Sequence, residues 1–210
     1  MTTDKKDFDA AAASWDEKPA RVKLAGEVAA AIIRQVAPNR AMKVADFGCG
    51  TGLVSLRLQP LVAFITGIDS SQGMLDILKA KIAEGKLPNI DTRLLDVEKG
   101  ETLTGEYDLI TSSMTLHHMR DPEALLRQLG AALVSGGILA IADLEPDGGL
   151  FHDDNTGVFH HGFDRVAVRA MFAEAGFDDI RDSRATEIVK RVADGSKKAF
   201  SVFLVSGRKK

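Results

Sequence analysis

A glycine-rich turn, Gly48-Cys49-Gly50-Thr51-Gly52, follows directly on a short apolar run of this chain. Glycine lets the backbone approach a ligand closely, and the amide groups of such a turn point outward from the start of a helix. Asp69 ends the next apolar run, where a carboxylate can accept hydrogen bonds from both hydroxyls of a ribose. These residue types in this order predict a binding site for a cofactor that contains a nucleoside.

Histidine side chains form the second group that could do chemistry, because they titrate closest to neutral pH. The five histidines fall in two segments, 117–118 and 152–161, which follow the expected fourth and fifth strands. We expect the two segments to rim one pocket. His118 or His161 would act there as a general base or a hydrogen-bond partner, and His117, His152 and His160 would contact the substrate. The alternative is that these histidines cap loops or pack around the cofactor.

The spacing of the glycines distinguishes between nucleoside cofactors. A dinucleotide fingerprint, G-x-G-x-x-G, requires its third glycine at position 53, where this chain has Leu53. The tyrosine-lysine dyad of short-chain dehydrogenases is also missing from the sequence, because Tyr107 is the only tyrosine and position 111 is threonine. A nicotinamide-dependent oxidoreductase is therefore the weaker alternative. The missing G-x-x-x-x-G-K-[ST] loop disfavours nucleoside triphosphate hydrolysis.

The elements that carry these residues alternate between strand and helix. Continuous apolar runs predict buried strands, and apolar residues at helical spacing predict amphipathic helices between them. The expected strands span 42–47, 62–68, 90–95, 107–111 and 138–142, and the expected helices span 19–36, 53–58, a segment capped by Ser70 or Ser71, and a segment opened by Asp121-Pro122. Buried strands separated by helices predict a parallel sheet with right-handed crossovers, whose ligand lies beyond the carboxyl ends of the strands.

The alternation of expected strands and helices ends in the last third of the chain. Residues 143–162 are rich in Asp, Gly and His without periodicity, which is typical of a functional loop. A helix at 164–175 and strand candidates at 179–190 and 199–206 follow, and the turn at 194–196 predicts a hairpin that sets an antiparallel strand into the edge of the sheet. The expected fold class is α/β, a Rossmann-like, doubly wound, mostly parallel seven-stranded sheet with a C-terminal antiparallel hairpin strand. We expect one domain over 1–210, divided into an N-terminal lid and helix (1–37), a cofactor-binding half (38–143), and a substrate loop with the hairpin (144–210).

Composition narrows the classes of partner. The 210 residues carry 27 Lys plus Arg against 30 Asp plus Glu, and the formal net charge of −3 argues against a nucleic-acid partner. With 45% hydrophobic residues and no apolar run of about 18 residues, the sequence predicts a globular protein that does not enter a membrane. Cys49 is the only cysteine, and the polar start lacks the apolar core of a secretory signal. We therefore expect a cytoplasmic protein without a disulfide, and no feature indicates its oligomeric state.

The chain resembles the class I S-adenosylmethionine-dependent methyltransferases over nearly its whole length, from Phe8 to about Val205. Four segments carry the resemblance, in order and at matching spacing: Val44–Gly52 is similar to the family's first motif, Gly67–Ser71 to its second, Leu95–Val97 to its third, and Leu133–Leu139 to the turn before its fifth strand. Within the family, the segments 8–16 and 107–119 look most like the small-molecule branch that includes the ubiquinone and menaquinone biosynthesis methyltransferases.

The resemblance implies S-adenosylmethionine as the cofactor and assigns roles to single residues. At the methionine end of the cofactor it places Gly48 and Gly50, with Asp46 as a brace of the glycine turn and Ser112 near the amino group. At the nucleoside end it places Asp69 at the ribose with Ser70 next to it, Met74 against the adenine, and Asp96 with the Val97 amide at the adenine edge. Trp15 would close over the cofactor from the lid. These roles are expectations that the geometry of the folded chain must support.

The loop after the expected fourth strand excludes several acceptors. Family members that methylate nucleic-acid amines carry an Asn/Asp-Pro-Pro-Tyr/Phe loop there, whereas this chain has Ser112-Ser113-Met114-Thr115. Cys49 lies inside the glycine turn rather than where a cytosine-C5 enzyme needs its nucleophile. No paired glutamates, typical of arginine methylation, occur between positions 109 and 120. We therefore expect a small-molecule methyl acceptor.

Two further alternatives concern a metal and the absence of turnover. The loop 152–161 holds histidine and aspartate side chains that can bind metals. Metal-dependent catechol-type members of the family have an Asp near the end of the fourth strand and Asp-Asn after the fifth; this chain has Asp154-Asn155 but Ser or Thr at the first position. We therefore expect no metal. A non-catalytic module that only binds S-adenosylmethionine is disfavoured by the many polar groups at 112–118 and 143–162.

Overall fold

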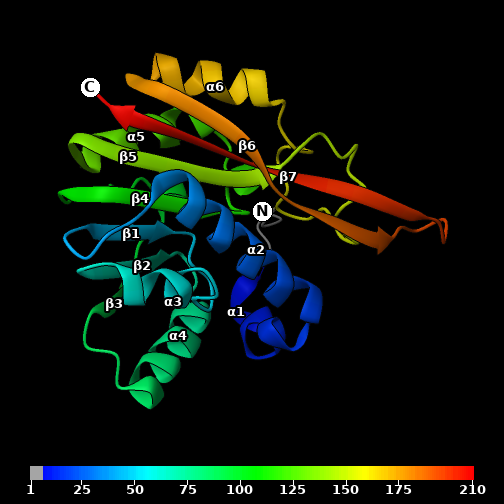
Figure 1. Ribbon diagram of the computed structural model, residues 1–210. Helices are drawn as coiled ribbons and strands as arrows, with labels where there is room; N and C mark the ends of the chain where they lie inside the picture. Colours follow the sequence, from blue (N-terminus) through cyan, green and yellow to red (C-terminus); the bar gives the residue numbers. More distant parts are fainter. Residues whose placement is uncertain (1–6) are drawn as a thin grey trace.

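The computed structural model of the chain describes residues 7–210 as a seven-stranded sheet with helices on both faces (Figure 1). The strands are β1 (Lys43–Phe47), β2 (Phe64–Asp69), β3 (Ile90–Leu94), β4 (Tyr107–Ser113), β5 (Leu133–Leu144), β6 (Phe177–Arg191) and β7 (Lys197–Lys209). The α-helices are α1 (Phe8–Ala11), α2 (Pro19–Val36), α3 (Ser55–Leu58), α4 (Gln72–Gly85), α5 (Pro122–Ala132) and α6 (Arg165–Glu174), with 3-10 turns η1 (Ala12–Glu17), η2 (Gln59–Leu61), η3 (Val97–Lys99) and η4 (Leu116–His118).

The strand order is β3-β2-β1-β4-β5-β7-β6. Strands β1 to β5 pair in parallel, and β7 runs antiparallel to both of its neighbours, β5 and β6. This arrangement confirms the fold class that the sequence predicts. The carboxyl ends of β1, β2 and β4 therefore meet at one edge of the sheet, which is where a ligand is expected in this architecture.

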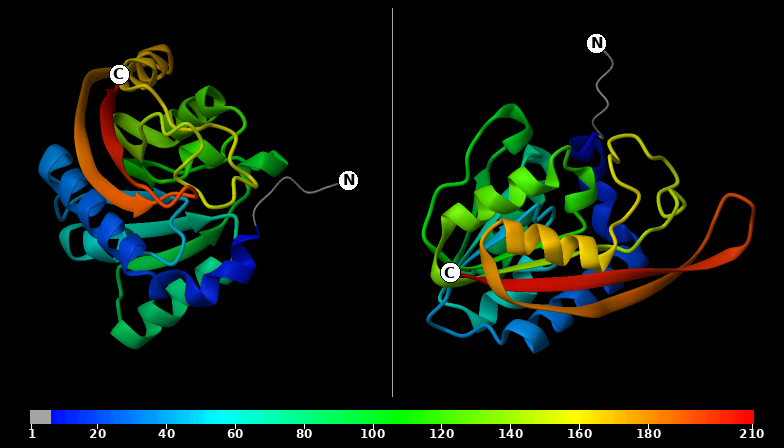
Figure 2. Two further views of the ribbon diagram at one scale, coloured as in Figure 1. Left: turned by 90° about the vertical axis from the view of Figure 1, so that its right-hand side faces the viewer. Right: turned by 90° about the horizontal axis from the view of Figure 1, so that it is seen from above.

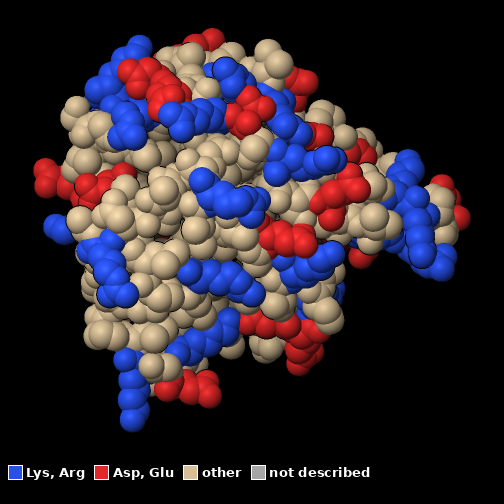
Figure 3. Space-filling model, viewed as in Figure 1, with Lys and Arg blue, Asp and Glu red and all other residues tan. Residues whose placement is uncertain are grey.

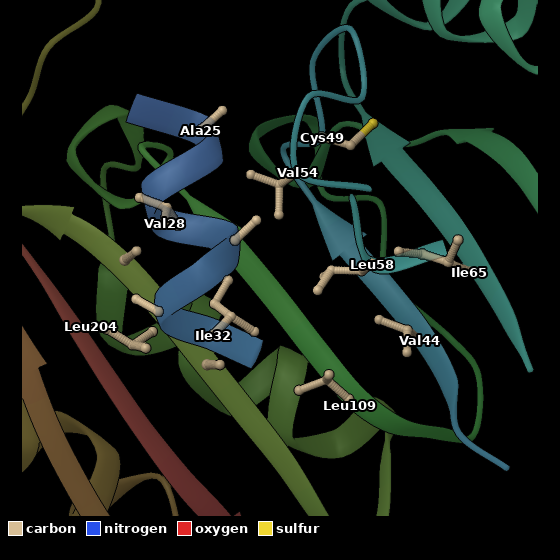
Figure 4. Packing of buried hydrophobic residues seen from close by; sticks show 14 of the residues in the cluster. Ala25, Val28, Ile32, Val44, Cys49, Val54, Leu58, Ile65, Leu109 and Leu204 are labelled. Atoms are coloured by element: carbon tan, nitrogen blue, oxygen red, sulfur yellow. The ribbon is translucent and has the colours of Figure 1, made fainter. Parts of the chain in front are cut away.

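Two apolar clusters hold the helices on the sheet, one on each face. On the first face, α2 packs on β5, β6 and β7 through a helical stripe that includes Ala25, Val28 and Ile32, which Figure 4 labels. On the second face, α5 and α6 contribute Leu126, Leu129 and Phe172. Because both faces are covered, the strands between them are buried on both sides, which explains their continuous apolar runs.

The start of helix α3 and the start of strand β5 differ from the expected positions, and the local backbone explains both differences. The helix after the glycine turn begins at Ser55 rather than at 53, because the turn continues through Gly52, whose φ is +82°. The Gly136-Gly137 pair does not separate the helix from a strand that begins at 138; it forms a bulge inside β5, with φ of +75° at Gly136. Across the bulge, Tyr107 pairs with Leu133 and Leu109 with Ile138.

The C-terminal hairpin is longer than expected and is placed differently in the sheet. The antiparallel strand β7 is inserted between β5 and β6, so that β6 forms the edge of the sheet. The ladder between β6 and β7 continues out to the pair Arg191–Lys197. The far end of the hairpin therefore projects beyond the body of the protein (Figure 2), and Figure 3 shows charged side chains of both signs over this projecting end.

The segment that precedes α2 lies beside α4 rather than apart from the fold (Figure 1). It consists of α1 and η1, and we call residues 8–17 the N-terminal segment. Residues 1–6 of the expected lid lie outside the described residues. Among the helices of residues 7–210, none combines the length and the apolar character that crossing a bilayer requires.

Candidate functional site

The glycine turn connects β1 to α3 at the carboxyl edge of the sheet. A Cβ atom at Gly48 would overlap the Thr115 side chain, so packing alone requires glycine there. At Gly50, with φ of +54°, the nearest neighbour of such a Cβ would be the Met74 sulfur, at 3.9 Å. The space between Gly50 and the buried Met74 is therefore open. A ligand that packs against the backbone of the turn needs such a space.

Asp46 lies under the turn and holds three elements together. Its carboxylate accepts hydrogen bonds from the Ser55 hydroxyl (2.5 Å) and the Thr111 hydroxyl (2.9 Å), which lie on α3 and β4. Complete burial raises the pKa of Asp46 to about 6, although the two hydroxyl groups partly offset this effect. These contacts hold the carboxylate under the turn, and the expected role of Asp46 as a brace of the turn stays a prediction.

Asp69 ties the glycine turn to the beginning of α4. One carboxylate oxygen accepts the Gly50 amide at 2.8 Å, and the other accepts the Ser71 amide at 2.9 Å. An ionised carboxylate has about four acceptor sites, so the same group can also accept the hydroxyls of a ribose. Ser70 is exposed next to it. The cap of α4 is Ser71, whose hydroxyl accepts the Met74 amide at 3.1 Å.

Asp96 and Val97 follow β3, the next strand along this edge. Asp96 is buried and caps the short η3 turn by accepting the Glu98 amide at 3.2 Å, and Lys99 Nζ lies 3.5 Å from its other oxygen. Val97 is half-buried at the start of the same turn. The structure thus shows Asp96 in a capping role, and its contact with an adenine stays a prediction.

Ser112 supplies a buried polar atom that the protein leaves without a partner. It lies near the end of β4, paired in register with Phe47 at the end of β1, and its side chain is only 1% exposed. Its hydroxyl oxygen has no hydrogen-bond partner among the residues that the structure describes. An orphaned hydroxyl beside the glycine turn is what a site for a polar ligand would contain, because a buried hydroxyl without a partner is otherwise unfavourable.

The N-terminal segment is fastened across this edge by two carboxylates. Asp9 accepts hydrogen bonds from the Ser71 hydroxyl (2.6 Å) and the Gly73 amide (2.7 Å), both at the start of α4. Asp16 accepts the Thr51 hydroxyl at 2.6 Å, within the glycine turn. Sequence reasoning missed both carboxylates, because a polar segment with two isolated aromatic residues gives no sign of which of its acids contacts the core.

The aromatic side chains of the N-terminal segment lie against its neighbours. Arg21 stacks its guanidinium 3.7 Å from the centre of the Trp15 ring, and the Phe8 ring lies 5.9 Å from Trp15. Phe8 also makes an edge-to-face contact with His118, with ring centres 5.3 Å apart. Trp15 therefore stabilises the segment through Arg21 and Phe8, and its closure over a cofactor stays a prediction.

Three of the five histidines meet at the ends of β4 and β5. His117 is buried and donates its Nδ1 proton to Asp143 at 2.7 Å, while its Nε2 lies 3.1 Å from Nε2 of His152. The Nδ1 atom of His118 lies 2.6 Å from the carbonyl oxygen of Gly157, in the long loop after β5. We call His117, His118 and His152 the histidine cluster. His117 and His152 bring the two histidine segments into contact, and both the pocket that these segments are expected to rim and the roles expected of the three residues stay predictions.

Burial and neighbouring charges shift the pKa values of Asp143 and His118 at the histidine cluster. Burial alone would raise the pKa of Asp143, but the nearby His117 and the hydrogen bonds from His117 and the Leu144 amide lower it overall. Burial, assisted by repulsion from His117, lowers the pKa of His118 to about 3. His118 is therefore neutral at pH 7 and is a weak proton acceptor, which argues against its expected role as a general base.

The rings of the other two histidines are not part of the histidine cluster, although the backbone of His160 contacts it. His160 packs its ring 5.0 Å from Phe163, donates its backbone amide to the His117 carbonyl, and keeps a buried Nε2 with no partner among the described residues. His161 is exposed and borders Gly149, where a Cβ would lie 3.2 Å from the imidazole ring. A role of His160 in substrate contact and of His161 as a base both stay predictions.

Comparisons with known proteins place the chain in a family. A family model described as a methyltransferase domain matches residues 21–182. An uncharacterized methyltransferase of Schizosaccharomyces pombe is 32% identical over 153 residues, which cover 66% of this chain and 54% of that protein. The ubiquinone biosynthesis O-methyltransferase of Coxiella burnetii is 32% identical over 107 residues, 51% of this chain and 45% of that protein. The chain thus spans about half the length of the curated relatives it matches.

A solved structure shows the same fold. The phosphoethanolamine N-methyltransferase 2 of Haemonchus contortus, in complex with phosphomonomethylethanolamine and S-adenosylhomocysteine, superimposes with a TM-score of 0.69. The match covers 86% of this chain and 52% of that one at 15% sequence identity. At this identity the likeness establishes the architecture alone.

Proposed function

Because the chain belongs to the methyltransferase-domain family, we propose that it transfers a methyl group from S-adenosylmethionine to a small-molecule acceptor at O, N or C. The observation that carries the proposal is the set of groups around the glycine turn. The open space before Gly50, the Asp69 carboxylate and the orphaned Ser112 hydroxyl face the same carboxyl edge of the sheet. A nucleoside carrying an amino acid offers hydroxyl and ammonium groups to these acceptors.

Bound S-adenosylmethionine supplies a methyl group on a positively charged sulfur, which is already activated for displacement. The protein must therefore align the acceptor with the sulfur–methyl bond and exclude water. The backbone at Gly50 and the Asp69 carboxylate would fix the cofactor, and Ser112 would accept a hydrogen bond from its amino group. Asp46 acts through the turn as a positioning residue, because its carboxylate contacts only Ser55 and Thr111 among the hydrogen bonds described.

The N-terminal segment would exclude water from the site. Asp9 and Asp16 attach it to α4 and to the glycine turn, on either side of the ribose-binding position proposed for Asp69. The loop between β5 and α6 lies beside this segment in both views of Figure 2, and it is joined to the histidine cluster at Gly157. We place the acceptor between this loop and the N-terminal segment, where the histidine cluster provides polar contacts.

The first test is calorimetric titration with S-adenosylhomocysteine and, in parallel, with NADH. We expect saturable binding of S-adenosylhomocysteine alone, lost in Asp69→Asn and retained in Asp76→Asn, a matched substitution of an exposed carboxylate on α4. Binding of NADH instead would favour the oxidoreductase alternative. Incubation of cell metabolites with methyl-labelled S-adenosylmethionine would then identify the acceptor, and tight cofactor binding without any labelled product would favour the non-catalytic module.

A further inference from the structure

The histidine cluster has the composition of a metal site. His117, His118 and His152 each offer a ring nitrogen, and these three nitrogens lie within 4.8 Å of one another. Neutral imidazole is the commonest protein ligand for transition metals. From the sequence alone we expect the two histidine segments to lie near each other but expect no metal, because the metal-dependent pattern of the family uses carboxylates after β4 and at 154–155.

Hydrogen bonds fix which nitrogen each ring presents. Asp143 Oδ1 accepts the Nδ1 proton of His117, and the two carboxylate oxygens also accept the His117 and Leu144 amides, at 3.3 Å and 2.7 Å. The carbonyl oxygen of Gly157 can only accept, so Nδ1 of His118 must also carry a proton. In neutral rings the lone pairs of His117 and His118 are therefore both on Nε2. Metal-bound histidines are oriented in the same way, by a carboxylate or a backbone carbonyl on the other nitrogen.

The spacing of the rings fits a tetrahedral ion. Two nitrogens bound at about 2.0–2.1 Å in tetrahedral geometry lie about 3.3 Å apart, and the Nε2 atoms of His117 and His152 are 3.1 Å apart. The same geometry places ring centres about 5 Å from one another. The ring centres of the three pairs are separated by 4.1 Å, 5.0 Å and 5.7 Å. The negative charge of the fully buried Asp143 would offset part of the charge of a cation bound here.

We propose that His117, His118 and His152 bind one divalent transition-metal ion, with Zn²⁺ as the best match, and that Asp143 and the Gly157 carbonyl hold the first two rings in place. Three histidine ligands leave a fourth tetrahedral position, which water or a donor atom of a bound molecule fills in sites of this kind. If the fourth ligand is a donor atom of the methyl acceptor, this part of the inference rests on the proposed function. Binding of the metal ion itself does not depend on the proposed function.

The competing explanation is a hydrogen bond without a metal. His152 would then donate its Nε2 proton to Nε2 of His117 and complete a chain from Asp143 through His117 to His152. The two explanations differ in one measurable property. A hydrogen-bonded chain has no affinity for a metal beyond that of exposed histidines, whereas three convergent ligands bind one ion per chain.

The test uses the full chain after treatment with a chelator and dialysis. Co²⁺ is titrated in while the visible absorption typical of tetrahedral Co²⁺ is recorded, Zn²⁺ is then used to displace it, and metal content is measured by mass spectrometry. We expect one ion per chain in the wild type and in His161→Gln, which alters an exposed histidine outside the histidine cluster. Asp143→Asn should weaken Zn²⁺ binding by about 10- to 100-fold, as loss of a partner of a ligand does, and His152→Gln should weaken it further.

Circular dichroism and S-adenosylhomocysteine binding show whether each variant is folded. Equal Zn²⁺ affinities in His152→Gln and His161→Gln, or a wild type that binds no Co²⁺ in a one-to-one ratio, would overturn the proposal. If S-adenosylhomocysteine still binds in that case, the proposed function survives without the metal. If the ion binds and S-adenosylhomocysteine does not, the metal site stands and the proposed function fails.

Discussion

Substitution of Gly50 by alanine separates the binding role of the glycine turn from its structural role. Gly50 adopts φ of +54°, and a left-handed conformation costs about 1–2 kcal/mol for a residue with a Cβ. The added methyl group would meet nothing closer than the Met74 sulfur at 3.9 Å, so no further loss of stability is expected. For a chain of this size, about 1–2 kcal/mol corresponds to a decrease in Tm of roughly 2–8 °C.

The effect on the ligand should be larger than the effect on the fold. At a concentration of S-adenosylhomocysteine about 100 times its Kd, binding stabilises the wild type by about 2.7 kcal/mol. A methyl group in front of Gly50 would overpack the contact with the ligand, and overpacking costs about 1–3 kcal/mol, which at its upper end is about a hundredfold in Kd. At the same ligand concentration, the stabilisation of Gly50→Ala would then fall to about 0.4 kcal/mol.

The assay is thermal unfolding with and without S-adenosylhomocysteine, and Gly136→Ala is the matched control. Gly136 has φ of +75°, and a Cβ added there would have no neighbouring atom within 4 Å, but this residue lies in the β5 bulge at the opposite edge of the sheet. We expect both variants to lose similar stability without ligand and only Gly50→Ala to lose the ligand-induced shift. Equal ligand-induced shifts in the two variants would refute the assignment of the turn to cofactor binding.

Three further predictions follow from single contacts. Ser112→Ala should leave the stability of the free protein unchanged or slightly higher, because it removes an unpaired buried hydroxyl, and should weaken S-adenosylhomocysteine binding in calorimetry. Asp9→Ala should lose two hydrogen bonds at about 0.5–1.5 kcal/mol each, and hydrogen exchange at residues 8–17 should become faster, whereas unchanged exchange would contradict this attachment. Burial raises the pKa of Asp46 from 3.8 to about 6, so the free wild type should lose stability as the pH rises between these values. In urea unfolding, Asp46→Asn should not show this loss; parallel pH profiles for the two proteins would contradict the raised pKa.

Much of the cofactor side could be predicted from the sequence because its signals are local. A glycine turn after a buried strand, and a carboxylate at the end of the next strand, act through backbone conformation and short sequence separations. Helix α2 was predicted with its observed bounds, since Pro19 at its first position and the apolar stripe that includes Val28 and Ile32 are properties of one segment.

The histidine side of the site depends on contacts that no local pattern encodes. Residues 145–162 have neither strand nor helix periodicity, so the position of His152 against His117 follows from how the loop folds back over β4 and β5. The attachment of Asp9 to α4 is equally non-local. Glycine at position 73 favours this attachment, because a Cβ there would lie 3.1 Å from the Asp9 backbone, and this tight contact exists only in the folded chain.

Strand β6 forms an edge of the sheet, and its backbone could pair with a strand of another molecule. An exposed edge strand can pair with a strand of another chain and begin aggregation. Charged and exposed side chains recur along β6, among them Asp178, Asp182, Arg184 and Glu187, and the register shifts between Asp178 and Arg181, with φ of +43° at Asp179. Repeated charges and an irregular ladder both obstruct addition of another strand. The long hairpin thus extends the sheet while its outer edge discourages intermolecular β-pairing.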